Sequence, residues 1–485
     1  MQRFILKHIL FFVIVVLAFS LRMYRITYPI LDWHSFRQAD TASVTKEYIA
    51  SNLSEPLIPQ YHDLSNIQSG KDNLAGYRMV EFPILNILTA AIALTFPGIS
   101  VSILSRLISV LFSLGALTFL FSFTKQYFGS RIAHVTALMF AILPYSIFYS
   151  RAVLPEPSLL FFSVGALWLF GHWLKTESVV SYLLSSLFLV AAFLLKPFVA
   201  CFAPVFVVLA VSKWGRKVFL QPLLYLYAVP AIGTFFWWRN WIEQFPSGIP
   251  ANDWLFNGNG IRFRPAWFRW LGWERLTKLL LGYTGLSLFF AGLVPKNWNI
   301  RTIPTHTLII WAWWLGLFAY SAVIATGSVQ HDYYQVIWIP ALCITLGQGV
   351  ITADAWLSKK LSPQYSSIAL VCIVGSMVLL SWQQIHGFFQ VNHWEYVRAG
   401  QAVDRLVPAD AKVIAPAFGD TSFLLQTNRR GWPIGFEIPD KIAKGATHYV
   451  NTSFDDETNQ LMKEFTILEQ TEEYVVIDLT TPKQQ

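Results

Sequence analysis

Long apolar runs separated by short polar segments fill the first 385 residues of the chain. Most of these runs approach the roughly twenty residues that an α-helix needs to cross a bilayer. The pattern predicts an all-α polytopic membrane domain over residues 1–385 with about eleven transmembrane helices. The runs cover approximately residues 9–21, 103–124, 131–150, 157–174, 178–196, 197–213, 217–238, 277–295, 305–326, 333–355 and 365–385.

The first run does not have the features of a cleaved signal peptide. Arg3 and Lys7 precede it, no small-x-small cleavage site follows it, and Arg22 and Arg25 come directly after it. We therefore expect a retained span with its N-terminus in the cytoplasm. The polar residues 27–80 then form an extracytoplasmic first loop.

One apolar piece, residues 82–96, is short. It has Pro83 at its start and is followed by Pro97-Gly98. If it does not cross the membrane, the cationic tracts of later loops all face the cytoplasm, as the positive-inside tendency requires. We therefore expect a re-entrant or juxtamembrane helix. The tracts are Lys125/Arg131, Lys175, Lys213/Arg216/Lys217, Lys296/Arg301 and Lys359/Lys360.

Composition agrees with a membrane protein and argues against other classes. The chain of 485 residues is 54% hydrophobic and only 13% charged, outside the range of soluble domains. Its net charge of +8 comes from short tracts between apolar runs, with no motif for nucleic acid. Cys201, Cys343 and Cys372 lie inside apolar runs and indicate neither a disulfide framework nor a metal cluster.

From about residue 386 the composition changes and charged residues return. Residues 412–417, 447–451 and 474–479 are typical of strands, and Trp394–Leu406 has the spacing of a helix. An odd number of preceding spans places this region outside. We therefore predict an extracytoplasmic α/β domain over residues 386–485.

The first loop carries an unusual density of polar groups. Asp32, His34, Arg37 and Asp40 fall within nine positions on a predicted short helix. With about 3.6 residues per turn, Arg37 lies on one stripe with His34 and Thr41 and on an adjoining stripe with Asp40. The plainer interpretation is a polar surface helix at the membrane.

The predicted topology brings four further polar pieces to the same outer face. These are residues 151–157, the Lys196-Pro197 junction, a second large loop over residues 239–276, and residues 328–334. Carboxylates, a histidine, a lysine and arginines at a membrane surface suit a reaction that holds an anionic phosphate while a hydroxyl is deprotonated. Glycosyl transfer from a lipid-linked sugar phosphate is such a reaction, because a fixed cation can stabilise the leaving phosphate and one base suffices. In-line attack would invert the anomeric centre.

The order of these pieces resembles the GT-C glycosyltransferases. More narrowly, it is similar to bacterial relatives of the protein O-mannosyltransferases and of the lipid A aminoarabinose transferase. The resemblance rests on Arg37-x-x-Asp40, Glu81-x-Pro83, Arg151 with Pro155-Glu156-Pro157, Lys196-Pro197, Tyr333-Tyr334 and the C-terminal domain. It implies transfer of a hexosyl, pentosyl or mannosyl-type sugar from a polyprenyl-phosphate donor to a glycan, lipid or protein acceptor, at the inner membrane of a bacterium.

The family's acidic first-loop motif, Asp-Glu-x-Arg-x-x-Glu, falls on residues 34–40 with two departures. His34 stands where the family has its catalytic acid, and Ser35 replaces the following Glu. Either His34 acts as the base with a near-neutral pKa, or Asp40 or Asp32 has taken that role, and we favour Asp40. The missing acidic pair also weakens a divalent metal site, so the cofactor stays unknown: a divalent cation is possible but is not indicated by the sequence.

The resemblance also implies contacts with the donor and its phosphate, above all for Lys196 and Tyr334. Phe82 stands where the family has a lysine, which removes one expected phosphate contact. The residues expected to bind substrate are Arg37, Glu81, Arg151, Glu156, Lys196, His331, Tyr333 and Tyr334.

Each of these positions also has a plainer interpretation. Lys196 can extend to the interface from a span end, Glu156 can be a solvated turn residue, and the tyrosines can be interface aromatics. The loop 239–275 interleaves arginines with tryptophans, which suits either phosphate and sugar binding or an interfacial amphipathic helix.

Two other functions remain open at this stage. A transporter or flippase of lipid-linked glycans would place ionisable residues in the middle of spans, whereas here they gather at the outer ends. A C-terminal binding module on an inactive membrane scaffold is also compatible with the departures at His34 and Ser35.

Overall fold

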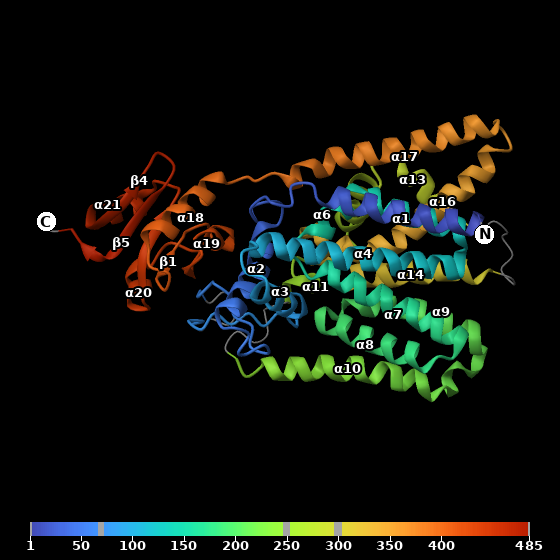
Figure 1. Ribbon diagram of the computed structural model, residues 1–485, viewed down its shortest axis with the longest axis horizontal. Helices are drawn as coiled ribbons and strands as arrows, with labels where there is room; N and C mark the ends of the chain where they lie inside the picture. Colours follow the sequence, from blue (N-terminus) through green and yellow to red (C-terminus); the bar gives the residue numbers. More distant parts are fainter. Residues whose placement is uncertain (1, 66–71, 246–252, 295–302, 484–485) are drawn as a thin grey trace. The chain divides into compact units, whose positions relative to one another are not determined.

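The computed structural model describes residues 2–65, 72–245, 253–294 and 303–483 (Figure 1). Contacts divide the chain into two compact units. The first, the helical unit, consists of Met1–Ile26, Leu107–Trp238 and Asn252–Gly387. The second, the α/β unit, consists of Thr27–Arg106, Arg239–Ala251 and Phe388–Gln485. The tract Lys296/Arg301 and parts of the two outer loops lie outside the described residues.

The expected domain boundary near residue 386 coincides with the end of the helical unit at Gly387. The residues of the first loop belong to the α/β unit. The assignment of catalysis to residues 1–385 stays a prediction.

All eleven predicted apolar runs form helical structure (Figure 1). Helices labelled α are α-helices, and segments labelled η are 3-10 or π-helical. The elements wholly or mostly within the helical unit are α1 (Gln2–Arg22), α4 (Val101–Phe128), α5 (Ser130–Ile142), α6 (Pro144–Arg151), α7 (Glu156–Thr176), α8 (Val179–Leu195), η1 (Pro197–Phe202), α9 (Ala203–Trp214), η2 (Gly215–Leu220), α10 (Pro222–Ile242), α11 (Asp253–Asn257), α12 (Pro265–Phe268), η3 (Arg269–Leu280), α13 (Gly285–Leu293), α14 (Thr305–Val323), α15 (Ala325–Gln330), η5 (Asp332–Trp338), α16 (Ile339–Leu357) and α17 (Pro363–Ile385).

Within the described residues, six helical stretches are long and apolar enough to cross a membrane. Two bent pairs, α5–α6 and η3–α13, raise the number to eight. The α5–α6 pair bends by 66° where Pro144 follows the extended residue Leu143, because a proline disfavours helical backbone at the residue before it. The chain is therefore a multi-pass membrane protein. The helices α1, α8 and α10 cover the other three predicted runs, and the count of eleven crossings stays a prediction.

Glycines allow α13 and α16 to pack with their backbones in close approach. A Cβ atom on Gly349 would lie 1.9 Å from the carbonyl oxygen of Leu288, and one on Gly292 would lie 2.0 Å from that of Thr345. Any larger residue would force these helices apart, because protein interiors have no spare volume. Contacts of this kind hold the neighbouring spans in fixed positions.

The α/β unit contains a mixed sheet with the strand order β2-β1-β3-β5-β4 among the described residues. Strand β1 is parallel to β2 and β3, whereas β5 is antiparallel to β3 and β4. Its elements are α2 (Ser35–Ala50), α3 (Ile84–Thr95), α18 (Trp394–Leu406), β1 (Lys412–Ile414), α19 (Thr421–Gln426), β2 (Arg430–Trp432), α20 (Ile438–Ala443), β3 (Ala446–Asn451), α21 (Asp456–Glu464), β4 (Phe465–Gln470) and β5 (Val475–Pro482), with the short η6 (His386–Phe389) before α18.

The sheet is covered on both faces because its strands alternate two apolar sets. Val413, Val450 and Val476 pack with side chains of α18 and α19. Ile414 and Tyr449 pack on the opposite face with side chains of α20 and α21. This confirms a C-terminal region with a mixed sheet, and the predicted helix Trp394–Leu406 has the bounds of α18.

The first loop is part of this unit. The backbone N–H of Leu64 donates to the carbonyl of Gly431 at 2.8 Å, and the N–H of Gly431 donates to that of His62 at 2.9 Å. Residues 62–64 thus continue the sheet beside β2, and the Leu64 side chain enters one of its two cores. These contacts bring the polar helix α2 into one compact unit with the C-terminal residues.

Helix α3 covers the short apolar piece that was expected not to cross. Its 12 residues span about 18 Å at 1.5 Å per residue, less than the roughly 30 Å of a bilayer core. It packs against α2, with Ala90 in a cluster that contains Val44, Tyr48 and Tyr61. Length and packing both favour the predicted juxtamembrane helix.

Candidate functional site

The predicted residues fall into two clusters, one within each unit. In the α/β unit, His34 precedes α2 with a left-handed backbone, and Arg37 follows on the first turn. The Arg37 guanidinium pairs with both carboxylate oxygens of Glu81, at 2.6 Å for Oε2. It also donates to Thr41 Oγ1 at 3.4 Å, as the predicted helical stripe requires. Arg37 and Glu81 are thus brought together.

Asp40 is the most strongly held acid of the first-loop motif. Asp40 is 7% exposed, and each of its two carboxylate oxygens accepts a hydrogen bond. Arg78 donates to Oδ2 at 2.8 Å and Thr421 donates to Oδ1 at 2.7 Å. Two donors on the two oxygens hold this carboxylate in one position.

The two partners of Asp40 were not predicted. Thr421 begins α19, more than 380 positions away in sequence, and no local pattern could pair it with Asp40. Arg78 lies three residues before Glu81, and its guanidinium also lies 5.2 Å from the ring centre of Tyr61. A search for a cation near a candidate acid could have suggested Arg78, but nothing in the sequence fixes its direction.

Asp32 has a different environment from Asp40. It is 2% exposed, accepts from Gln38 at 2.7 Å, and forms an ion pair with Arg106 at 3.0 Å. The buried Arg106 also donates to the backbone carbonyls of Tyr28 and Pro29. The geometry therefore favours a structural role for Asp32, which fastens the start of the first loop to α4.

Replacing Asp32 by alanine should reduce stability. The substitution leaves the guanidinium of Arg106 buried without its carboxylate, and breaking a buried pair in this way costs about 3–5 kcal/mol. We expect a lower melting temperature of the detergent-purified protein, measured by tryptophan fluorescence. An unchanged melting temperature for Asp32→Ala, with Asp410→Ala as an exposed control, would contradict this role.

His34 lies at the partly exposed start of the same motif. Its ring centre is 5.0 Å from that of Trp33 and 6.0 Å from that of Phe36. The Trp33 ring is exposed and stacks on Phe388. His34 therefore stays available as the alternative base.

In the helical unit, the sequence predicts four residues that the structure brings together. The Lys196 ammonium forms an ion pair with Glu156, and it lies 5.7 and 5.8 Å from the ring centres of Tyr333 and Tyr334. All three partners come from elements far apart in the sequence, namely α7 and η5. We call these four residues the Lys196 cluster.

Local sequence explains the positions of the two charged groups. Helix α8 ends at Leu195 because Pro197 forces extended backbone on Lys196, with φ −154° and ψ 123°. Glu156 is the first residue of α7, where the exposed N–H groups of the helix favour a carboxylate. The Lys-Pro and Pro-Glu-Pro motifs thus each place a charge at a helix end.

The Lys196 cluster is buried and nearly closed. Glu156 is 5% exposed, and its Oε2 atom has no hydrogen-bond partner in the part of the chain described. The cluster surrounds a cavity of about 10 Å³, which is near the space that one water requires. A ligand larger than water would have to displace side chains here, with Lys196 and Glu156 Oε2 ready to contact it.

Asp332 forms a neighbouring polar group that sequence analysis described only as part of a loop. The hydroxyl of Tyr149 donates to Asp332 Oδ1, and the hydroxyl of Tyr145 donates to its backbone carbonyl. Arg275 lies 4.0 Å from Asp332 Oδ2 and donates to the carbonyl of Val329 at 2.7 Å. His331 stacks on Tyr333. Tyr145 and Tyr149 lie in an apolar run, so their spacing gave no polar signal.

Arg151 contacts backbone rather than a carboxylate. It is 1% exposed and donates to the carbonyls of Tyr24 and Arg25, the latter at 2.7 Å. These hydrogen bonds connect α6 to the end of the first span. They account for its burial, and its expected role in substrate binding stays a prediction.

The loop 239–275 shows features of both a binding loop for phosphate and sugar and an interfacial amphipathic helix. Trp267 is buried, whereas Trp254, Trp270 and Trp273 are exposed. Arg275 reaches Val329 and Asp332, as described above, and its guanidinium lies 5.3 Å from the Trp270 ring centre. Residues 246–252 of this loop lie outside the described part.

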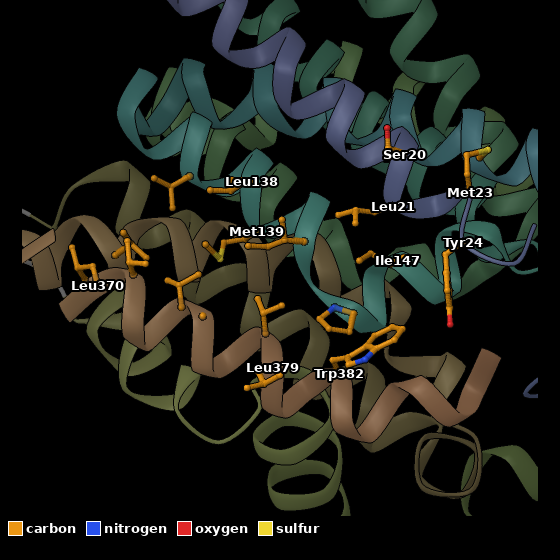
Figure 2. Close-up of a pocket in the computed structure, with 18 residues that line it drawn as sticks. Ser20, Leu21, Met23, Tyr24, Leu138, Met139, Ile147, Leu370, Leu379 and Trp382 are labelled. Carbon is orange, nitrogen blue, oxygen red and sulfur yellow. The ribbon is translucent and has the colours of Figure 1, made fainter. Parts of the chain in front are cut away.

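A large cavity in the helical unit is apolar and contains none of the predicted site residues. Its volume is about 1180 Å³, and it lies in the helical unit between α1, α5, α6 and α17. Figure 2 shows Tyr24 and Trp382 toward one end and Leu138 and Leu370 toward the other. Such a lining suits a hydrocarbon chain, whereas charge stabilisation requires the polar clusters. Among the described residues, no group of three or more His, Cys, Asp or Glu side chains could hold a metal ion.

Comparison with known proteins gives matches to one family and one fold. Residues 83–239 match the family described as dolichyl-phosphate-mannose-protein mannosyltransferase. No curated protein matches the chain.

Solved structures of the same fold include two kinds of protein. ArnT from Cupriavidus metallidurans bound to undecaprenyl phosphate is similar at a TM-score of 0.63 and 14% identity, with 96% of this chain and 97% of that chain covered. ArnT in the apo state gives 0.62 and 15%, with the same coverage of both chains. The Archaeoglobus fulgidus oligosaccharyltransferase in complex with Zn and sulfate gives 0.57 and 12%, covering 91% of this chain and 68% of that chain. The resemblance predicted from the sequence is confirmed in these terms: residues 83–239 match the mannosyltransferase family, and the fold is that of ArnT and of the oligosaccharyltransferase.

Proposed function

We propose that this glycosyltransferase moves a sugar from a polyprenyl-phosphate donor to an acceptor hydroxyl on the extracytoplasmic face, with inversion of the anomeric centre. The observation that carries the proposal is the Lys196 cluster, a buried cation beside two tyrosines and a carboxylate oxygen without a donor. The family match and the similarity to ArnT bound to undecaprenyl phosphate support the choice of donor.

Lys196 holds the donor phosphate in this proposal. When the bond between the anomeric carbon and the phosphate oxygen breaks, its electron pair remains on the polyprenyl phosphate, whose negative charge increases. A fixed cation in a water-poor site stabilises this charge without reorganisation. Glu156, which pairs with Lys196 in this structure, then shares the ammonium with the phosphate, while its Oε2 accepts from a sugar hydroxyl.

Asp40 accepts the proton of the acceptor hydroxyl as that oxygen attacks the anomeric carbon. Its contacts with Arg78 and Thr421 hold the carboxylate in one orientation, which general base catalysis requires. His34 is the alternative base. Arg37, Glu81, Arg151, His331 and the two tyrosines keep their proposed roles in substrate binding.

For the location, we propose a bacterial inner membrane with eleven crossings, a cytoplasmic N-terminus and an extracytoplasmic C-terminal domain. The cationic tracts and the short α3 support this topology. The acceptor is a glycan, lipid or protein.

Reconstitution tests the proposal directly. Purified protein in liposomes that contain polyprenyl-phosphate sugars, with extracts of cell-envelope glycans as acceptors, should produce a glycosylated acceptor and free polyprenyl phosphate. Deletion of the gene should cause the natural lipid-linked donor to accumulate, which identifies it. Movement of the donor across the liposome membrane without added acceptor, and without product, would instead indicate a flippase.

A further inference from the structure

A polar cavity of about 600 Å³ lies wholly within the α/β unit, apart from the two clusters already described. Its volume is within the range of about 300–1,000 Å³ that small-molecule sites occupy. Five parts of the chain line it: residues 27–29, Lys46 of α2, the start of α4, Val397 of α18, and the region around the end of α19. Its lining residues are Thr27, Tyr28, Pro29, Lys46, Gly98, Ile99, Ser100, Val101, Ser102, Val397, Leu425, Gln426 and Asn428.

Lys46 provides the positive charge of the cavity. Its ammonium donates to the carbonyl of Leu425 at 3.3 Å and to Oδ1 of Asn428, and it forms no ion pair within the described residues. The two nearest acids are engaged elsewhere: Asp404 pairs with Arg429 at 2.9 Å, and Glu47 lies 3.9 Å from Arg430. The hydrogen bonds of Lys46 given above thus go to neutral acceptors, while Asp404 and Glu47 act on its charge from a greater distance.

The start of α4 adds further donors. Ser100, Val101 and Ser102 line the cavity where this 28-residue helix begins. The first N–H groups of a helix have no partner within the helix, and its N-terminus carries partial positive charge. Together with Lys46, they form an environment that favours an anion over a neutral ligand.

The remaining lining groups favour a polyhydroxylated ligand. The hydroxyls of Thr27, Ser100 and Ser102 and the amides of Gln426 and Asn428 can donate to or accept from sugar hydroxyls. No carboxylate is among the lining residues, so an acidic ligand meets no like charge there.

We propose that this cavity binds an acidic sugar unit of the acceptor, with the carboxylate or phosphate of that sugar at Lys46 and its hydroxyls at the serine, threonine and amide side chains. The assignment to the acceptor rests on the proposed function, whereas the binding itself does not. Lys46 lies six residues after Asp40 on α2, which places the two side chains on different faces of that helix.

Binding should depend on pH. Burial lowers the pKa of Lys46 to about 8, against the opposing effect of Asp404 on α18 and Glu47 on α2. His62, the other titratable group that interacts with Lys46, stays neutral because burial lowers its pKa to about 3. The ammonium is the form that binds an anion, so affinity should fall as the pH rises above 8. A bound anion raises the pKa of Lys46, which moves this loss to a somewhat higher pH.

The experiment uses the full chain in nanodiscs and titrates it with glucose 6-phosphate, glucuronate, glucose and inorganic phosphate, followed by ligand-observed NMR. Both acidic sugars should bind at least about tenfold more tightly than glucose and than inorganic phosphate. Lys46→Gln should weaken acidic-sugar binding about tenfold, whereas Lys46→Arg should largely retain it. Lys463→Gln, at an exposed lysine of α21, is the matched control and should leave binding unchanged.

Three results would overturn the inference: equal binding of glucose and the acidic sugars, equal binding by Lys46→Gln and the unaltered protein, or inorganic phosphate binding as tightly as glucose 6-phosphate. Failure of the proposed function is a separate outcome. Transfer from the polyprenyl-phosphate donor without preference for acidic sugars would remove the cavity assignment alone. Acidic-sugar binding without any transfer would remove the proposed function and, with it, the role of the cavity in holding an acceptor.

Discussion

Lys196→Ala should reduce sugar transfer by about 10²–10³-fold, the loss typical of removing one preorganised group that stabilises developing charge. The ammonium of Lys196 is the cation of a buried cluster, in which it forms an ion pair with Glu156 beside the rings of Tyr333 and Tyr334. Without it, the leaving polyprenyl phosphate has lost its nearest proposed charge partner. The measurement is transfer of radiolabelled sugar from the lipid-linked donor by reconstituted protein.

A structural explanation must be separated from this one, because Lys196→Ala also leaves the Glu156 carboxylate buried without its partner. Breaking a buried pair costs about 3–5 kcal/mol, enough to unfold part of the protein. The double variant Lys196→Ala/Glu156→Gln removes the uncompensated charge. If Lys196 holds the phosphate, the double variant should regain thermal stability but not transfer. Recovery of transfer in the double variant would show that the pair only supports the fold.

Lys196→Arg gives a second control. Arginine keeps the positive charge, but its planar guanidinium needs more space than the cavity of about 10 Å³ offers. We expect transfer between that of the unaltered protein and that of Lys196→Ala. The order of transfer activity among the unaltered protein, Lys196→Arg and Lys196→Ala therefore reports on the charge at position 196. The melting temperature reports separately on packing.

The membrane part of the fold could be predicted from the sequence because its signal is local. A run of apolar residues specifies a helix, and Lys196-Pro197 specifies where one ends. Helix α18 and three of the strands were also predicted, since their apolar residues follow helical or alternating spacing. Strands β2 and β4 were not predicted: both lie at an edge of the sheet, β2 has only three residues, and β4 has no fully buried position.

The candidate site could be predicted only in part because its contacts are not local. The order of motifs identified Lys196, Glu156, Tyr333 and Tyr334, which do lie together. The order of motifs could not show that Asp32 forms an ion pair with Arg106, because the two residues are 74 positions apart in the sequence. Likewise, the contact between Asp40 and Thr421 depends on the packing of α19 against α2, for which the sequence has no signal.

Asp40→Asn should reduce transfer by about 10²–10⁴-fold, the contribution typical of a general base. The amide keeps the size of the side chain, and its oxygen can still accept from Thr421. Its NH2 group then faces the Arg78 guanidinium, so the melting temperature is measured beside transfer to separate a structural effect. The amide cannot take a proton from the acceptor hydroxyl at neutral pH. The same transfer assay measures the loss, and Asp410→Asn, at an exposed position of the same unit, serves as the matched control.

His34→Ala decides between the two bases. If Asp40 is the base, this variant should keep most of its transfer activity, because the partly exposed imidazole of His34 then takes no proton from the acceptor. If His34 is the base, the two results exchange: His34→Ala loses transfer and Asp40→Asn retains it. Full activity in both variants would contradict the placement of the base in the first-loop motif.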